Sequence, residues 1–146
     1  MKRTLSVYQF KVTLLDTNPP VWRRIQVDNF ITLSRFSAIL LAVMGWNNSH
    51  LHDLRIGGKK YGMPAGEPDE YSKGLIDEKK KKLRDFAEED LRKFEFAYDF
   101  GDGWRHEVEL EKVRITATKA FNRNASMARG IARRMIAADH TVTRIS

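Results

Sequence analysis

The chain has 146 residues, of which 42% are hydrophobic and 10% aromatic, and it contains no cysteine. This composition supports one folded domain with a real core and argues against a disordered chain. The lack of cysteine excludes disulfides, cysteine-ligated zinc and thiol catalysis. The apolar runs are far shorter than the ~20 residues that cross a bilayer, and no apolar stretch follows the basic first residues. We therefore expect a cytoplasmic protein without a membrane span or a signal peptide.

Charge is divided unevenly along the chain, whose net charge is +7. Residues 1–111 contain 18 Lys and Arg against 18 Asp and Glu, whereas residues 112–146 contain eight basic residues and one acid, Asp139. The last quarter therefore carries the whole surplus. We expect a folded domain over residues 1–115 and a basic, Ala- and Arg-rich tail over residues 116–146 that is either helical or poorly ordered.

The first elements expected are two strands and a helix. Residues 8–14 alternate apolar and polar side chains, as in a half-buried strand, and residues 21–27 repeat the pattern after a proline-rich break. Residues 33–44 carry apolar side chains at spacings of three and four, which predicts a helix. Thr32 is suited to cap its N-terminus, and Gly45 is suited to end it.

Hairpins dominate the rest of the predicted domain. Gly57-Gly58 supplies the positive φ angles that a tight hairpin turn requires. The elements expected around and after it are strands over 50–56 and 59–61, a loop over 62–74, a short helix over 83–91, and strands over 94–100 and 104–110. This order predicts an α+β fold, with a mostly antiparallel sheet built from hairpins and helices packed on one side.

The first candidate site is the pair His50 and His52. Residues two apart on a strand point to the same side, so both imidazoles would face together. A divalent transition metal could be held there if His106 and either Asp99 or Asp102 completed the ligand set. The alternative is that both histidines are structural and bond to nearby backbone.

The second candidate site is the turn and return strand that contain Asp99, Asp102, Trp104 and His106. An aspartate beside His106 could act as an acid–base pair or as a metal ligand. The alternative is an ordinary turn, because Asp-Gly pairs favour turns and Asp side chains bond to their own backbone. No sequence feature places a nucleophile beside a base, and the glycines match neither the dinucleotide-binding nor the P-loop pattern.

Two basic segments could contact nucleic acid. Trp22-Arg23-Arg24 could stack on a base or grip phosphate, although a core Trp with ion-paired Arg is the commoner arrangement. In the tail, a helix over residues 125–138 would place Met127, Ile131 and Met135 on one stripe. The basic side chains that could contact nucleic acid are Arg123, Arg129, Arg133 and Arg134. Such a basic amphipathic helix could also bind an anionic membrane or a partner groove, or simply dock on the domain.

Several blocks of the sequence resemble the plasmid pRiA4b ORF-3-like family over about residues 5–113. The matching blocks, in order, are Pro19 to Arg24, Leu33 to Trp46, His50 to His52, Ile56 to Gly62 and Tyr98 to His106. The resemblance implies a fold and a plasmid or mobile-element context, and it implies no particular reaction. Relatives are expected to continue into a Cys-Pro-Pro-Glu-Asp-Cys-Gly-Gly-like stretch, which this chain lacks, and the tail could therefore derive from a frameshift or a fusion.

These features lead to two functional hypotheses. The first is a non-enzymatic accessory or binding domain that contacts nucleic acid through its basic tail, which would make binding strongly dependent on salt. The second is a metal-binding domain or metal-dependent enzyme that uses His50, His52 and His106 with Asp99 or Asp102. An interaction module that uses an exposed sheet edge or aromatic patch is a third possibility.

Overall fold

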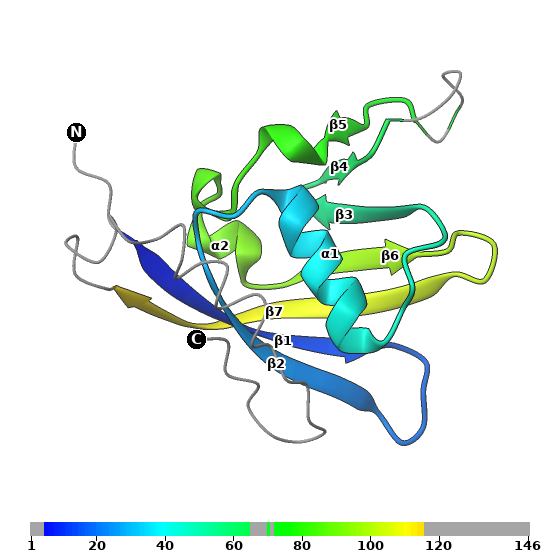
Figure 1. Cartoon of the computed structure of the whole chain (residues 1–146), viewed down its shortest axis with the longest axis horizontal. Coiled ribbons are helices and arrows are strands. Elements are labelled where there is room, and N and C mark those ends of the chain that lie inside the picture. The colour runs from blue at the N-terminus through cyan, green and yellow to red at the C-terminus, as the bar shows by residue number, and fades with distance from the viewer. Residues whose placement is uncertain (1–4, 65–69, 71, 116–146) are drawn as a thin grey trace.

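The computed structural model describes residues 5–64, 70 and 72–115. A single sheet forms the body of this part of the chain (Figure 1). Its strands are β1 (Ser6–Leu14), β2 (Val21–Asp28), β3 (His52–Ile56), β4 (Lys59–Gly62), β5 (Ile76–Asp77), β6 (Phe94–Tyr98) and β7 (Trp104–Ile115). The helical elements are α1 (Leu33–Met44), α2 (Glu88–Leu91) and the 3₁₀ turns η1 (Glu78–Lys80) and η2 (Leu83–Asp85). No helix among these residues is long and apolar enough to cross a membrane.

Strand order in the sheet is β2-β1-β7-β6-β3-β4-β5. Neighbouring strands are antiparallel, except that β4 and β5 run parallel. The long strand β7 pairs with β1 on one side and with β6 on the other. It therefore joins the N-terminal hairpin to the later strands in one continuous sheet.

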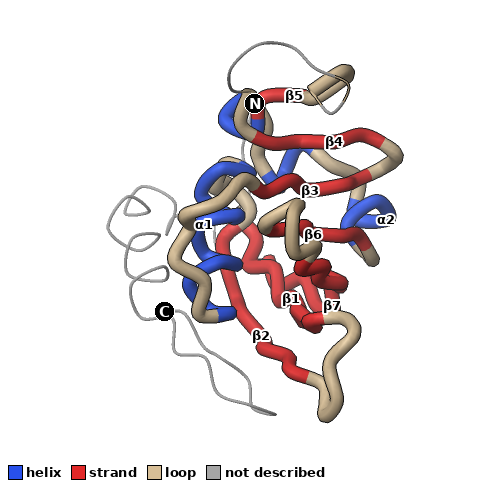
Figure 2. The backbone as a smooth tube through the Cα atoms, turned by 90° about the vertical axis from the view of Figure 1, so that its right-hand side faces the viewer, coloured by secondary structure: helices blue, strands red, loops and turns tan. Residues whose placement is uncertain are grey.

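The expected α+β fold with helices packed on one side is wrong. The described residues form one seven-stranded mixed sheet with two α-helices, and α2 spans only four residues. Only α1 lies along the sheet as a helix of several turns, as Figure 2 shows. The described part of the chain is mostly sheet, because β1 and β7 are long strands that pair along the whole of β1.

The predicted helix over residues 33–44 is confirmed as α1. The Thr32 hydroxyl accepts a hydrogen bond from the Arg35 amide at 3.1 Å, and Gly45 ends the helix at φ 83°. In the core, the Phe36 ring lies 5.0 Å from that of Phe10 and 6.2 Å from that of Phe94. These contacts tie α1 to strands β1 and β6.

The short helix predicted over residues 83–91 is divided into η2 and α2. The preceding chain runs antiparallel to residues 29–33, where Leu33 N–H donates to Lys81 O and Leu83 N–H donates to Ile31 O. The two helical pieces are separated by Phe86 and Ala87, whose backbone angles are extended rather than helical.

Candidate functional site

A shallow hollow of about 470 Å³ lies at the end of the sheet where β3 begins. Its volume lies within the ~300–1,000 Å³ range of small-ligand sites. Its walls combine apolar and polar side chains, and the exposed fractions of Leu51 and Met63 are 48% and 47%. The lining residues are Asn48, Ser49, His50, Leu51, His52 and Met63.

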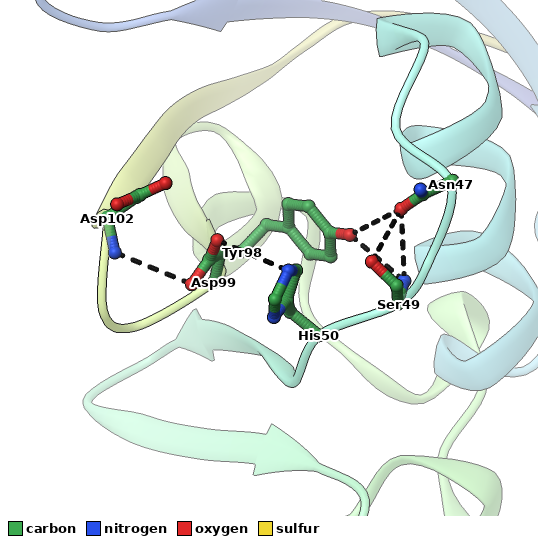
Figure 3. Close-up of polar contacts among 6 residues, drawn as sticks. All are labelled: Asn47, Ser49, His50, Tyr98, Asp99 and Asp102. Carbon is green, nitrogen blue, oxygen red and sulfur yellow. Dashed lines mark hydrogen bonds and ion pairs between the residues drawn. The ribbon is translucent and has the colours of Figure 1, made fainter.

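The loop that forms one wall is held by Tyr98, at the end of β6 (Figure 3). The Tyr98 hydroxyl donates to Asn47 Oδ1 at 3.2 Å and accepts from the Ser49 amide at 3.0 Å. The Ser49 hydroxyl donates to the same Asn47 oxygen at 2.7 Å. Buried Tyr98 thus fixes the loop against the sheet, and the Ser49 hydroxyl bonds to an amide rather than to a base.

Asp99 connects the loop between β6 and β7 to this wall of the hollow. Its backbone adopts φ 57°, a left-handed conformation that Asp tolerates better than most residues. One carboxylate oxygen accepts from the Asp102 amide at 3.4 Å, and the other lies 3.6 Å from His50 Nε2. The His50 side chain is 54% exposed and its ring meets that of Tyr98 edge-on. His50 is therefore accessible, with a carboxylate behind one ring nitrogen.

His52 has a different partner, in the buried interior. Its Nε2 lies 2.9 and 3.1 Å from the two carboxylate oxygens of Glu78, and the Ser37 hydroxyl donates to the same carboxylate at 3.1 Å. Exposed fractions are 7% for His52, 1% for Glu78 and 0% for Ser37. This buried cluster joins β3, η1 and α1.

His106 is enclosed on β7. Its Nδ1–H donates to Phe96 O, and its Nε2 accepts from the Trp46 indole N–H, both at 3.0 Å. Burial lowers the pKa of His106 below its ordinary value, and the hydrogen bond to Phe96 opposes that shift. With both ring nitrogens occupied, this imidazole is neutral and structural. Trp104 stacks against Trp46 with ring centroids 5.3 Å apart.

The structure brings only part of the predicted site together. His50 and Asp99 are adjacent, and His50 and His52 both line the hollow, whereas His106 is tied to Phe96 and Trp46. Asp102 contributes its amide to the turn, and Figure 3 shows its carboxylate away from His50. Across residues 5–64, 70 and 72–115, no three His, Cys, Asp or Glu side chains form a group that could hold a metal ion.

The two segments considered for nucleic-acid contact are Trp22-Arg23-Arg24, on strand β2, and the C-terminal tail. Lys11 Nζ and the Arg24 guanidinium each lie 4.9 Å from the Trp22 ring centroid, and Arg24 also pairs with Glu111 at 2.9 Å. Arg24 is therefore ion-paired, as in the alternative considered for that segment, whereas Trp22 is half-buried and is not part of the hydrophobic core. The arginines predicted to contact nucleic acid, and the tail that carries them, lie outside the described residues.

Sequence reasoning missed Glu78 and Ser37. Glu78 precedes a run of four lysines that was expected to face solvent. Glu78 was therefore not recognised as a buried carboxylate. Ser37 lies between apolar residues of α1. Its position on the buried face of the predicted helix could have indicated that its hydroxyl needs a buried hydrogen-bond partner.

Together, the fold and the site define a single-sheet domain with a ligand-sized hollow at one end. The chain belongs to the plasmid pRiA4b ORF-3-like protein family, whose sequence model matches residues 6–140. The match extends past residue 115, the boundary expected from charge, and covers most of the basic tail.

Two relatives illustrate this membership. The chain is 39% identical over 109 residues to the uncharacterized protein y4hQ of Sinorhizobium fredii (strain NBRC 101917 / NGR234), an alignment that covers 74% of this chain and 55% of the relative. The chain thus spans about half the length of that relative. It is also similar to the crystal structure of the protein of unknown function MM3350 from Methanosarcina mazei Go1. That likeness has a TM-score of 0.67 at 33% identity and covers 79% of this chain and 64% of the other.

Proposed function

We propose that this protein is a non-catalytic accessory domain of plasmid or mobile-element origin that contacts nucleic acid through its basic C-terminal segment. The observation that carries the proposal is the separation of charge, because residues 112–146 hold the entire net charge of +7. Phosphate contacts by Lys and Arg supply most of sequence-independent nucleic-acid binding.

Ion pairs on the sheet support a role for the tail rather than the body. Arg55 pairs with Asp53 at 3.2 Å, Lys93 with Glu107 at 3.5 Å and Arg105 with Glu95 at 4.0 Å. Cations so paired offer little net charge to a phosphate backbone. After residue 115 the sequence has six basic residues and one acid, so acids of the same segment are too few to neutralise its positive charge.

The geometry of the hollow supports a binding role over a catalytic one. The Ser49 hydroxyl donates to Asn47, and the hydroxyl of Ser37 is buried on Glu78. Neither hydroxyl is arranged toward an imidazole as an activated nucleophile requires.

Salt-dependent binding to a short DNA duplex tests the proposal. The full chain is compared with a variant carrying Arg129→Gln, Arg133→Gln and Arg134→Gln, and its affinity is measured over a range of salt concentrations. Each lost phosphate contact reduces the log–log salt slope by roughly 0.9, so the triple variant is expected to lose about 2 to 3.

A charge-matched variant provides the control. Lys59→Gln, Lys79→Gln and Lys80→Gln also remove three exposed cations, but from the body of the domain. The log–log salt slope of this control variant is expected to stay within about 1 of the slope of the parent chain. Equal losses in the two triple variants, or no binding by the parent chain, would overturn the proposal.

A further inference from the structure

The hollow is lined in part by a nearly buried imidazole, His52, whose side-chain hydrogen bonds to the described residues all run through Nε2. The other ring nitrogen, Nδ1, makes no hydrogen bond to the described residues.

Glu78 determines what that nitrogen offers. A carboxylate accepts hydrogen bonds, so His52 Nε2 carries a proton and donates it toward Glu78. In the tautomer with its proton on Nε2, the Nδ1 atom carries a lone pair and can accept a hydrogen bond from a ligand in the hollow. Ser37 donates to the same carboxylate and holds it in place.

His50 also lies near a carboxylate, at the rim of the hollow and at a longer distance. Asp99 Oδ2 faces its Nε2 at 3.6 Å, and the ring is 54% exposed. Two imidazoles with carboxylates behind them thus line one hollow, whereas its six lining residues include no Lys or Arg. The hollow thus offers hydrogen-bond acceptors close to the carboxyl groups of Glu78 and Asp99. The exposed apolar side chains of Leu51 and Met63 lie beside them.

From this geometry we propose that the hollow binds an arginine side chain of a partner peptide. The guanidinium N–H groups would donate to His52 Nδ1 and to His50, the two carboxylates would stabilise its positive charge, and Leu51 and Met63 would pack on its methylene stem. Glu78 is a positioning residue, because it acts by orienting His52. The proposal concerns a different surface from the nucleic-acid proposal and does not depend on it.

A pair of matched peptides tests the ligand class. Acetyl-Gly-Arg-Gly-amide and its citrulline counterpart have nearly the same shape, but citrulline is neutral. Each is titrated by calorimetry into the full chain carrying Arg129→Gln, Arg133→Gln and Arg134→Gln, so that these arginines of the chain do not compete. The arginine peptide is expected to bind roughly tenfold or more tightly than the citrulline peptide.

Two substitutions, made in the same triple Arg→Gln variant, test the carboxyl groups beside the two histidines. Asp99→Asn keeps a residue that tolerates φ 57° and removes the rim charge, and Glu78→Gln removes the buried charge. Each is expected to weaken arginine-peptide binding roughly tenfold, whereas Glu107→Gln, on the face away from α1, is expected to leave it unchanged. Nitrogen-15 shifts of the His52 ring report its protonated nitrogen, which Glu78→Gln is expected to change and Asp99→Asn is not.

Three outcomes would overturn the proposal: no binding of the arginine peptide, equal binding of the citrulline peptide, or unchanged affinity in Asp99→Asn. A His52 ring protonated on Nδ1 in the parent would also contradict it. If Glu78→Gln fails to fold, the Asp99→Asn and citrulline comparisons still decide the matter, since neither alters the core.

Discussion

At the scale of single residues, hydrogen-bond partners decide what each histidine can do. His50 is exposed beside Asp99, and His52 bonds to Glu78 through Nε2. His106 is closed on both sides by Phe96 and Trp46. The three side chains are alike in chemistry, but among them only His50 and His52 line the hollow.

Burial of His106 predicts a loss of stability in mild acid. Because its folded pKa lies below the 6.5 of the unfolded chain, the contribution is fully present above about pH 6.5. As the pH falls below that value, the unfolded chain gains a proton that the folded protein resists, so the free energy of unfolding decreases. Urea denaturation near pH 7.5 and pH 5.5 measures this change.

His106→Gln separates this effect from other titrations. The variant is expected to be less stable near pH 7.5, because a buried hydrogen-bonded ring is lost, and to show a smaller decrease between the two pH values. A decrease equal to that of the parent would show that His106 is not its source.

Asp28 carries a buried charge with incomplete compensation. It is 2% exposed, its Oδ2 has no partner among the described residues, and burial raises its pKa above 3.8, while its bond from the Phe30 amide opposes the shift. The unfolded chain therefore ionises first as the pH rises, and ionised Asp28 lowers stability near neutral pH.

Asp28→Asn is accordingly expected to raise the free energy of unfolding near pH 7, since Asn keeps an acceptor for the Phe30 amide. The gain should shrink as the pH falls and disappear below about 3.8, the pKa in the unfolded chain, because the carboxyl is then protonated in both states. Asp16→Asn, at a side chain that is 80% exposed, serves as the comparison and should change little. A less stable Asp28→Asn variant at neutral pH would contradict this account.

At the scale of elements, local signals explain α1. The Thr32 hydroxyl accepts from the Arg35 amide, one of the donors left unsatisfied at a helix start. Thr32→Ala is expected to cost about 0.5–2 kcal/mol in the free energy of unfolding, whereas Thr32→Ser should cost much less because it keeps the acceptor. Thermal denaturation of both variants compares them, and an equal loss in both would point to packing of the Thr methyl group instead.

The hairpins were also accessible to local reasoning. Gly57 and Gly58 adopt φ 59° and 80°, and β3 and β4 pair directly across them, as predicted. The short helix over residues 83–91 was wrongly expected to be continuous: Phe86 and Ala87 are extended, and the turn before them is held by bonds from Leu83 and Arg84 to residues 29–31. A helical pattern cannot reveal a partner that lies far away in the sequence.

At the scale of the whole molecule, one helix and one sheet share a single aromatic core. Phe36 contacts Phe10 of β1 and Phe94 of β6, and it is fully buried. Phe36→Ala is expected to cost about 3–5 kcal/mol, because it leaves a cavity between α1 and two strands. Phe36→Leu should cost clearly less. Chemical denaturation compares them, and a loss below about 1 kcal/mol for Phe36→Ala would mean that the core closes around the gap.

The candidate site was predictable only in part. The spacing of His50 and His52 indicated a shared surface, and both line the hollow. Convergence with His106 did not occur, because Trp46 and Phe96 hold that ring. The role of Glu78 could not be read from its neighbours, since its burial depends on α1 and β3 rather than on the lysines that follow it.

The sequence by itself determined α1, the hairpin turns, the alternating strands and the location of the surplus charge, because each depends on residues that are close together in the chain. Tertiary structure decided the seven-stranded mixed sheet, since β1 pairs with β7 from the other end of the described domain. It also decided which histidine nitrogens remain available. Strand pairing and hydrogen-bond partners are contacts between distant residues, and no local pattern specifies them.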